Sequence, residues 1–179
     1  MLVSLAACRA DDNLLDDGSA PVRAVQESDE GYRVIFRGLV VDTLSGRSQF
    51  GHIIDPRTRE RNWIVELVMA DDFAGGMVIA LPSDQPPSES RYDVSIDALE
   101  ERPEGGAVLA YRHGLYRVFR GRAGSVTFTH VSDTLVSGNF DVTLVGEVAE
   151  RGREAIRGES EISGSFAARP GQPGYVLGL

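Results

Sequence analysis

The sequence predicts an all-β fold, an antiparallel β-sandwich with little helix, and a small closed β-barrel is the alternative arrangement. Three observations favour this fold class. From residue 31 onward, apolar residues recur mostly with period two; the runs are short; and Gly, Pro, Asp and Ser separate them. About ten such runs occur, and either a sandwich or a barrel would bury one face of each strand.

The expected strands follow one another along the chain with at most one helical turn, at 97–102, between them. Trp63, Val65 and Leu67 define one face of the clearest strand, and Asn62 and Glu66 point the other way. In chain order, the expected strands are 32–36, 49–54, 63–69, 77–81, 92–96, 107–112, 115–120, 125–131, 135–145 and 155–168.

Two of these strands share a short pattern of an aliphatic residue, Ser, Gly, a polar residue and Phe, at 136–140 and again at 162–166. In a strand, the aliphatic residue, the Gly and the Phe lie on one face. A Gly at such a position lets a neighbouring aromatic ring approach closely. We therefore interpret the repeat as one packing solution used twice, and a binding repeat is the alternative.

The 179 residues provide one domain of ordinary size, and 42% hydrophobic with 25% charged residues is typical of a globular fold. The organisation we expect is a truncated signal at 1–7, an acidic tether at 8–30, the β-domain at 31–170 and a C-terminal tail at 171–179. The formal charge of -9, with 18 Arg and no Lys, disfavours nucleic acid as a partner.

The N-terminal residues Leu5-Ala6-Ala7-Cys8 resemble a bacterial lipobox, the processing site of exported lipoproteins. The resemblance implies that Cys8 carries the lipid and becomes the mature N-terminus. Only six apolar residues precede Cys8, fewer than a secretory signal contains, so we expect the true start to lie upstream. Arg9 follows, and not the Asp that retains many lipoproteins at the inner membrane, so the resemblance favours the outer membrane. The alternative is that Cys8 is an ordinary residue.

The β-domain also resembles a group of uncharacterised bacterial lipoproteins. The residues that carry this likeness are Gly124-Ser125-Val126-Thr127-Phe128-Thr129 and the following Val136-Ser137-Gly138-Asn139-Phe140. The resemblance implies a β-sandwich domain of the cell envelope without an assigned catalytic activity.

Motifs for catalysis and metal binding are lacking. No Gly-x-Ser-x-Gly occurs, the three histidines are far apart, and the single Cys allows neither a disulfide nor a cysteine zinc site. We therefore expect no cofactor, no metal and no enzymatic activity. A glycan hydrolase remains the alternative, because Glu147, Glu150, Glu159 and Glu161 lie near the ends of the last two strands and glycosidases use a pair of carboxylates.

Four arginines, Arg112, Arg117, Arg120 and Arg122, alternate with apolar residues and form a candidate stripe for an anionic polysaccharide or lipopolysaccharide. Pairing with carboxylates across strands explains them equally well.

The function that the sequence favours is a lipid-anchored cell-envelope protein acting as a non-catalytic binding or structural module, with an envelope glycan or protein as partner. The alternative is a self-assembling or partner-docking subunit that uses a strand edge or the apolar residues 175–179.

Overall fold

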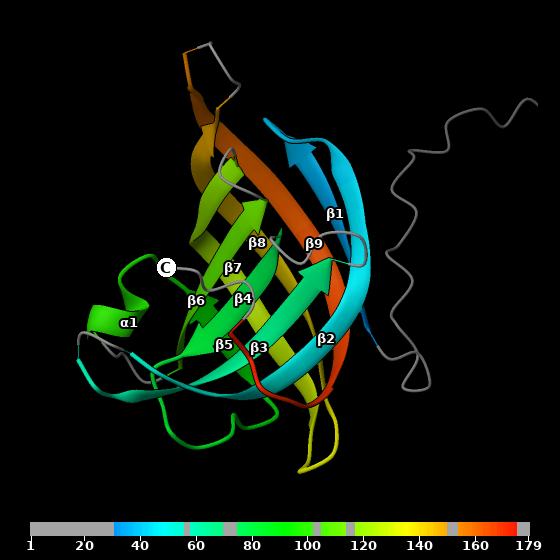
Figure 1. Cartoon of the computed structure of the whole chain (residues 1–179), viewed down its shortest axis with the longest axis vertical. Helices are drawn as coiled ribbons and strands as arrows, with labels where there is room; N and C mark the ends of the chain where they lie inside the picture. The colour runs from blue at the N-terminus through cyan, green and yellow to red at the C-terminus, as the bar shows by residue number, and fades with distance from the viewer. Residues whose placement is uncertain are drawn as a thin grey trace, which may run out of the picture.

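The computed structural model describes residues 31–55, 58–69, 75–101, 105–113, 117–149 and 154–174. Cys8 with its lipobox, Glu150 and the tail residues 175–179 lie outside the described residues. The described chain forms nine strands and one short helix (Figure 1), so the all-β prediction is confirmed. The elements are β1 (Gly31–Gly38), β2 (Asp42–Ile54), β3 (Arg61–Met69), β4 (Gly75–Leu81), β5 (Arg91–Val94), α1 (Ala98–Glu101), β6 (Gly106–His113), β7 (Arg117–Val131), β8 (Val136–Val148) and β9 (Ile156–Pro170).

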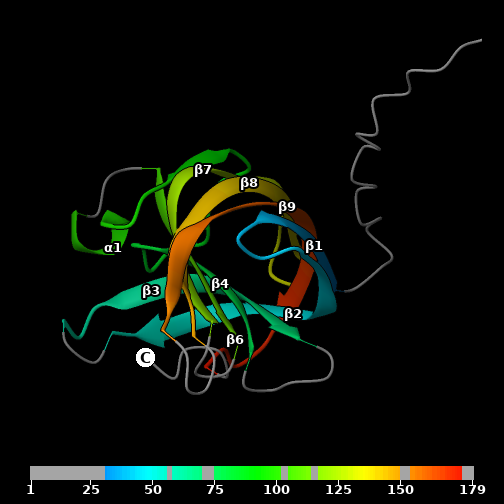
Figure 2. The same cartoon turned by 90° about the horizontal axis from the view of Figure 1, so that it is seen from above.

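The strands are hydrogen-bonded in the order β1-β2-β3-β4-β6-β5-β7-β8-β9, and β9 pairs with β1 to close a barrel (Figure 2). The long ladders are antiparallel, and among the described strands only the short β5–β6 and β2–β9 pairings are parallel. The single closed sheet is the arrangement that the sequence offered as the alternative to a two-sheet sandwich. Period-two patterning cannot separate the two, because a strand buries one face in either arrangement.

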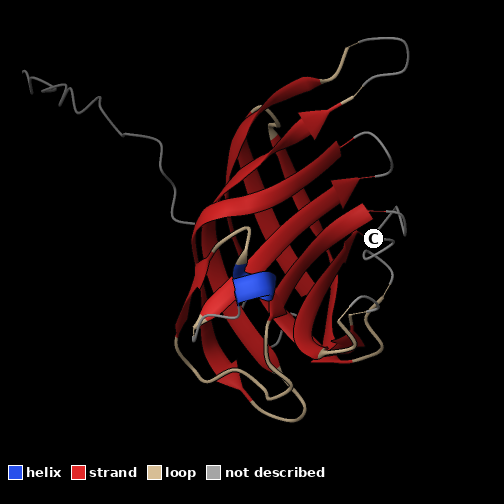
Figure 3. Cartoon of the chain, turned by 90° about the vertical axis from the view of Figure 1, so that its left-hand side faces the viewer, coloured by secondary structure: helices blue, strands red, loops and turns tan. Residues whose placement is uncertain are grey.

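Most strand boundaries differ from the expectation by one to three residues, and two differences are larger. The two strands expected on either side of Gly121 are one strand, β7, described from Arg117 to Val131, with a register shift between Gly121 and Ala123. Strand β2 begins at Asp42, well before the expected 49, and its first residues pair with β1. Helix α1 provides the single turn expected at 97–102 and lies on the outside of the sheet (Figure 3).

The barrel interior is filled by side chains. Aromatic rings pack in a chain across it: the centroids of Trp63 and Phe128 are 5.7 Å apart and those of Phe128 and Phe166 are 5.9 Å apart. Large side chains that are fully buried come from most of the strands and include Phe36, Trp63, Leu67, Met77, Ile79, Leu109, Tyr111, Phe119, Phe128 and Phe166.

The repeated Ser-Gly-x-Phe pattern is a reciprocal packing device between β8 and β9. Gly138 lies opposite Phe166, and Phe140 lies opposite Gly164. A methyl group at Gly138 would lie 2.8 Å from the Phe166 ring, and one at Gly164 would lie 2.7 Å from the Phe140 ring. The two rings stack with centroids 6.5 Å apart. The prediction that each Gly admits an aromatic ring is therefore confirmed.

Strands β3 and β4 are buried on both faces, whereas the sequence pattern predicted half-buried strands. The outward side chains Ile64, Val68, Val78 and Ala80 form a second apolar cluster outside the barrel. Glu66 points outward from β3 as predicted, yet it is fully buried. The nearly continuous apolar runs of β3 and β4 are typical of strands covered on both sides.

Candidate functional site

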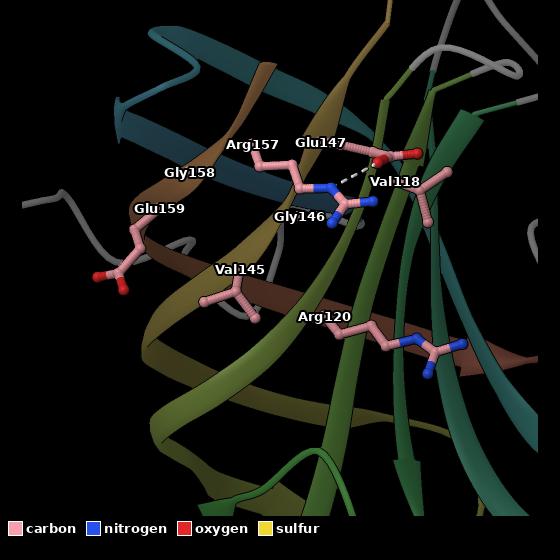
Figure 4. Close-up of a pocket in the computed structure, with 8 residues that line it drawn as sticks. All are labelled: Val118, Arg120, Val145, Gly146, Glu147, Arg157, Gly158 and Glu159. Atoms are coloured by element: carbon pink, nitrogen blue, oxygen red, sulfur yellow. Dashed lines mark hydrogen bonds and ion pairs between the residues drawn. The ribbon is translucent and has the colours of Figure 1, made fainter. Parts of the chain in front are cut away.

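A shallow groove lies on the outer face of the barrel, where β7, β8 and β9 run side by side (Figure 4). Its volume is about 610 Å³. Phe119 of β7 and Leu144 of β8 belong to the core and point inward. Their neighbours along each strand, Val118 and Arg120 on β7 and Val145 on β8, therefore point outward. The lining residues are Val118, Arg120, Val145, Gly146, Glu147, Arg157, Gly158 and Glu159.

The floor of this groove contains a cross-strand glycine pair, Gly146 opposite Gly158. Gly146 packs so tightly against Phe119 of β7 that a methyl group would lie 2.7 Å from the ring. A side chain at this position would therefore push β7 and β8 apart.

Three of the four charged side chains that line the groove have an ion-pair partner. Arg157 Nε lies 3.3 Å from the Glu147 carboxylate, its cross-strand neighbour (Figure 4). Arg122 donates two hydrogen bonds to the Glu159 carboxylate, the longer of which is 3.1 Å. These pairs are exposed, so each contributes little to stability, but they neutralise both carboxylates locally.

Arg120 is the exception among the charged groups that line the groove. It has neither an ion-pair partner nor a hydrogen-bond partner in the described part of the chain. Figure 4 shows its guanidinium extending in the opposite direction from Glu159. Five N–H donors of a permanently charged group are therefore available at one wall of the groove.

The structure brings three of the four predicted arginines to one side of the sheet. Arg120 and Arg122 have the same strand parity on β7, and Arg112 of β6 lies directly opposite the outward Val118. The sequence did not predict that Val145 and Arg157 line the groove, nor that Glu159 pairs with Arg122. All three depend on the register between β8 and β9. The shared parity of positions 118, 120 and 122 was a usable signal.

Arg117 has the opposite parity, that of the core residue Phe119, and lies beside Tyr111 on the inner side of the sheet. Its Nη1 lies 3.9 Å from the Asp42 carboxylate. Burial raises the pKa of the neighbouring Tyr111 hydroxyl, and the Arg117 guanidinium partly offsets this effect. Arg117 therefore does not belong to the outer groove.

The hydroxyl groups of Tyr32 and Tyr111 are buried inside the barrel, and neither has a hydrogen-bond partner among the residues that the structure describes. Burial raises the pKa of Tyr32 far above its ordinary value, and the nearby Tyr111 raises it further. Both groups thus stay neutral, as expected of phenols that face an apolar interior.

Of the carboxylates proposed for a hydrolase, Glu147 and Glu159 both line the groove, whereas Glu161 lies further along β9. Glu147 lies opposite Arg157, and Arg157 and Glu161 are four residues apart on β9, which corresponds to about 13 Å along a strand. Hydrolytic carboxylate pairs are about 5 to 9.5 Å apart. The register therefore does not bring Glu147 and Glu161 to glycosidase spacing.

The histidines lie apart on the fold. His52 Nε2 is 2.8 Å from the Asp84 carbonyl oxygen, and His130 Nδ1 is 3.6 Å from the Glu89 carboxylate. Within the described ranges, no group of three or more His, Cys, Asp or Glu side chains is placed to hold a metal ion. A search of the same ranges for helices with the length and hydropathy of a membrane span found none.

Comparison with family models, with curated proteins and with solved structures found no match for this chain. The resemblance to envelope lipoproteins therefore stays a prediction.

Proposed function

We propose that this protein is a lipid-anchored cell-envelope protein whose barrel is a non-catalytic binding module, and that the β7–β9 groove takes the anionic groups of an acidic polysaccharide. The observation that carries the proposal is the unpaired guanidinium group of Arg120. It is the cation of the groove that has no protein partner in the described residues. Arginine binds sulfate, phosphate and carboxylate through parallel N–H donors, so an unpaired guanidinium in a groove suits such a group.

The local charge distribution supports an anionic ligand. Glu147 and Glu159 would repel an anion, but each is paired with an arginine, Arg157 and Arg122 respectively. The remaining charge of the groove is the positive charge of Arg120. The protein as a whole carries a formal charge of -9, so any polyanion it binds must be bound at a local positive site and not by net attraction.

The packing of the barrel supports a site on the outer face. In barrels that hold a ligand the interior contains a cavity, whereas here aromatic and aliphatic side chains from most strands occupy it. An elongated polymer also fits an open groove better than a closed interior. The apolar Val118 and Val145 offer surfaces on which sugar rings can pack.

Attachment to the envelope rests on the lipobox resemblance at Cys8. Residues 9–30 provide a tether of 22 residues between Cys8 and β1, which spans roughly 75 Å when fully extended. A tether of this length would hold the groove within reach of polymers at the membrane surface.

The test measures binding to dextran sulfate, with neutral dextran as the ligand control. We expect saturable binding that weakens about threefold to tenfold in Arg120→Gln, and that weakens further as salt is raised to 0.15 M. Arg91→Gln is the matched control, because Arg91 is an exposed arginine on β5, where it contacts Asp93. Equal losses in both variants, or no binding by the unaltered protein, would contradict the proposal.

A further inference from the structure

The outer faces of β3 and β4 carry an apolar cluster that is covered from outside the barrel. Ile64, Val68, Val78 and Ala80 are all buried, and Ile53 of β2 packs against them. Their strand neighbours Trp63, Leu67 and Ile79 belong to the barrel core, so these four side chains must point away from it. Burial on this side requires a covering segment.

The chain that follows β9 leads directly to this face. Gly171 N donates a hydrogen bond of 2.9 Å to the Phe50 carbonyl oxygen, and Gln49 Nε2 donates one of 3.3 Å to the Gln172 carbonyl oxygen. Pro173 lies so close above Gly51 that a methyl group there would be 2.9 Å from its ring. Residues 171–174 therefore lie along the outside of β2, where Figure 1 shows the red segment turning back after β9.

Glu66 fixes the end of this segment over β3. Its carboxylate accepts hydrogen bonds from Gly174 N at 3.1 and 3.2 Å and from Gln49 Nε2 at 2.7 Å. A carboxylate with 0% exposure needs such donors, because a buried charge without them is very costly. The contact thus determines where the backbone stands at Gly174.

Gly174 consequently lies at the centre of the apolar cluster. On β3, Glu66 is flanked by Ile64 and Val68 on the same face, and across the ladder it lies opposite Val78. The next five residues are Tyr-Val-Leu-Gly-Leu, four of which are apolar and large. Five extended residues span about 17 Å, enough to cross two strands spaced about 4.8 Å apart.

We propose that residues 175–179 bind in cis over the outer faces of β3 and β4 and cover Ile64, Val68, Val78 and Ala80. The segment acts as a strap: Glu66 positions its start, and the apolar side chains after Gly174 bury the cluster. Residues 175–179 would then bind to their own chain, and not to the sheet of a neighbouring molecule as in the alternative drawn from the sequence.

The experiment uses thiol labelling of the full chain. Cys8 is the single cysteine, so a Cys8→Ser background leaves each introduced thiol as the sole target. The reporter is Ala80→Cys, a small change within the cluster. The control reporter is Val41→Cys in the β1–β2 turn, where the native side chain is 82% exposed.

We expect a maleimide to label Ala80→Cys at least tenfold more slowly than Val41→Cys. Adding Tyr175→Asp and Leu177→Asp should accelerate labelling of Ala80→Cys at least tenfold and leave Val41→Cys unchanged. The emission of Trp63, a buried core residue and the single Trp, reports that the barrel stays folded. Leu177→Ser alone repeats the comparison with a smaller perturbation.

The proposal would be overturned if the labelling rate of Ala80→Cys stayed the same with both sets of tail substitutions while the barrel remained folded. Protection that disappears on dilution, together with a dimer by light scattering, would also overturn it, because the occupant would then be a second copy. Protection independent of protein concentration, and lost with the tail substitutions, supports binding in cis.

Discussion

Gly164→Ala tests the reciprocal glycine–phenylalanine packing between β8 and β9. The new methyl group would lie 2.7 Å from the Arg33 carbonyl oxygen and 2.7 Å from the Phe140 ring. Neither neighbour yields readily, because the carbonyl belongs to the β1 backbone and the Phe140 ring stacks on Phe166. Overpacking of this kind costs about 1 to 3 kcal/mol.

A partial gain offsets this cost, since replacing a strand glycine by alanine recovers about 0.5 to 1 kcal/mol of conformational entropy. We expect a net destabilisation of about 1 to 2 kcal/mol. Gly158→Ala is the matched control on the same strand, because the nearest atoms to its methyl group would belong to the Leu39 side chain, at 3.3 Å. That variant should stay within about 0.5 kcal/mol of the unaltered protein or be slightly more stable.

Equilibrium unfolding in urea, followed by Trp63 fluorescence, measures the difference. With a denaturant slope of roughly 2 kcal/mol/M, Gly164→Ala should lower the unfolding midpoint by about 0.5 to 1 M. Equal midpoints for Gly164→Ala and the unaltered protein, or equal losses in Gly164→Ala and Gly158→Ala, would refute the packing argument.

Three further predictions concern a buried phenol, a buried carboxylate and the lipid anchor. Burial raises the pKa of Tyr32 in the folded protein, so above about pH 10 the unfolded chain loses the phenol proton while the folded barrel keeps it. The free energy of unfolding then falls by about 1.4 kcal/mol per pH unit because of this group. In urea titrations between pH 9 and 11, the free energy of unfolding of Tyr32→Phe should therefore fall less steeply than that of the unaltered protein. Glu66→Ala removes the acceptor for Gly174 N and Gln49 Nε2 and should cost about 2 to 4 kcal/mol in the same assay; an unchanged midpoint would show that the Glu66 hydrogen bonds contribute nothing. Expression from an upstream start in a bacterial host should yield an N-terminal peptide that begins at acylated Cys8, and an intact mass that retains unmodified residues 1–7 would remove the anchor.

Local patterning predicted the elements whose two faces differ in chemistry. Tyr32, Val34 and Phe36 face the core as their alternation indicated. The start of β2 escaped prediction, because Asp-Thr-Leu-Ser-Gly-Arg-Ser has one apolar side chain and becomes a strand by pairing with β1. Strand β7 was expected as two strands because its interruption coincides with glycines at 121 and 124.

Long-range pairing explains what the sequence left open about the site. Parity along β7 already separates Arg117 from Arg120 and Arg122, and the structure places them accordingly. The pairing of Arg122 with Glu159 joins residues 37 positions apart, and no local pattern reports such a register. The burial of Glu66 could not be predicted from local sequence either, because it depends on residues after β9, of which Gly174 donates a hydrogen bond to the Glu66 carboxylate.

The most direct test of the binding proposal is an NMR titration of the arginine side-chain Nε–H signals with dextran sulfate. We expect the Arg120 signal, assigned through Arg120→Gln, to shift in a saturable manner, and the signals of Arg91 and of the ion-paired Arg122 to shift much less. Uniform small shifts of all arginines, or a saturable shift confined to arginines outside the β7–β9 groove, would contradict the assignment of this groove as the anion site.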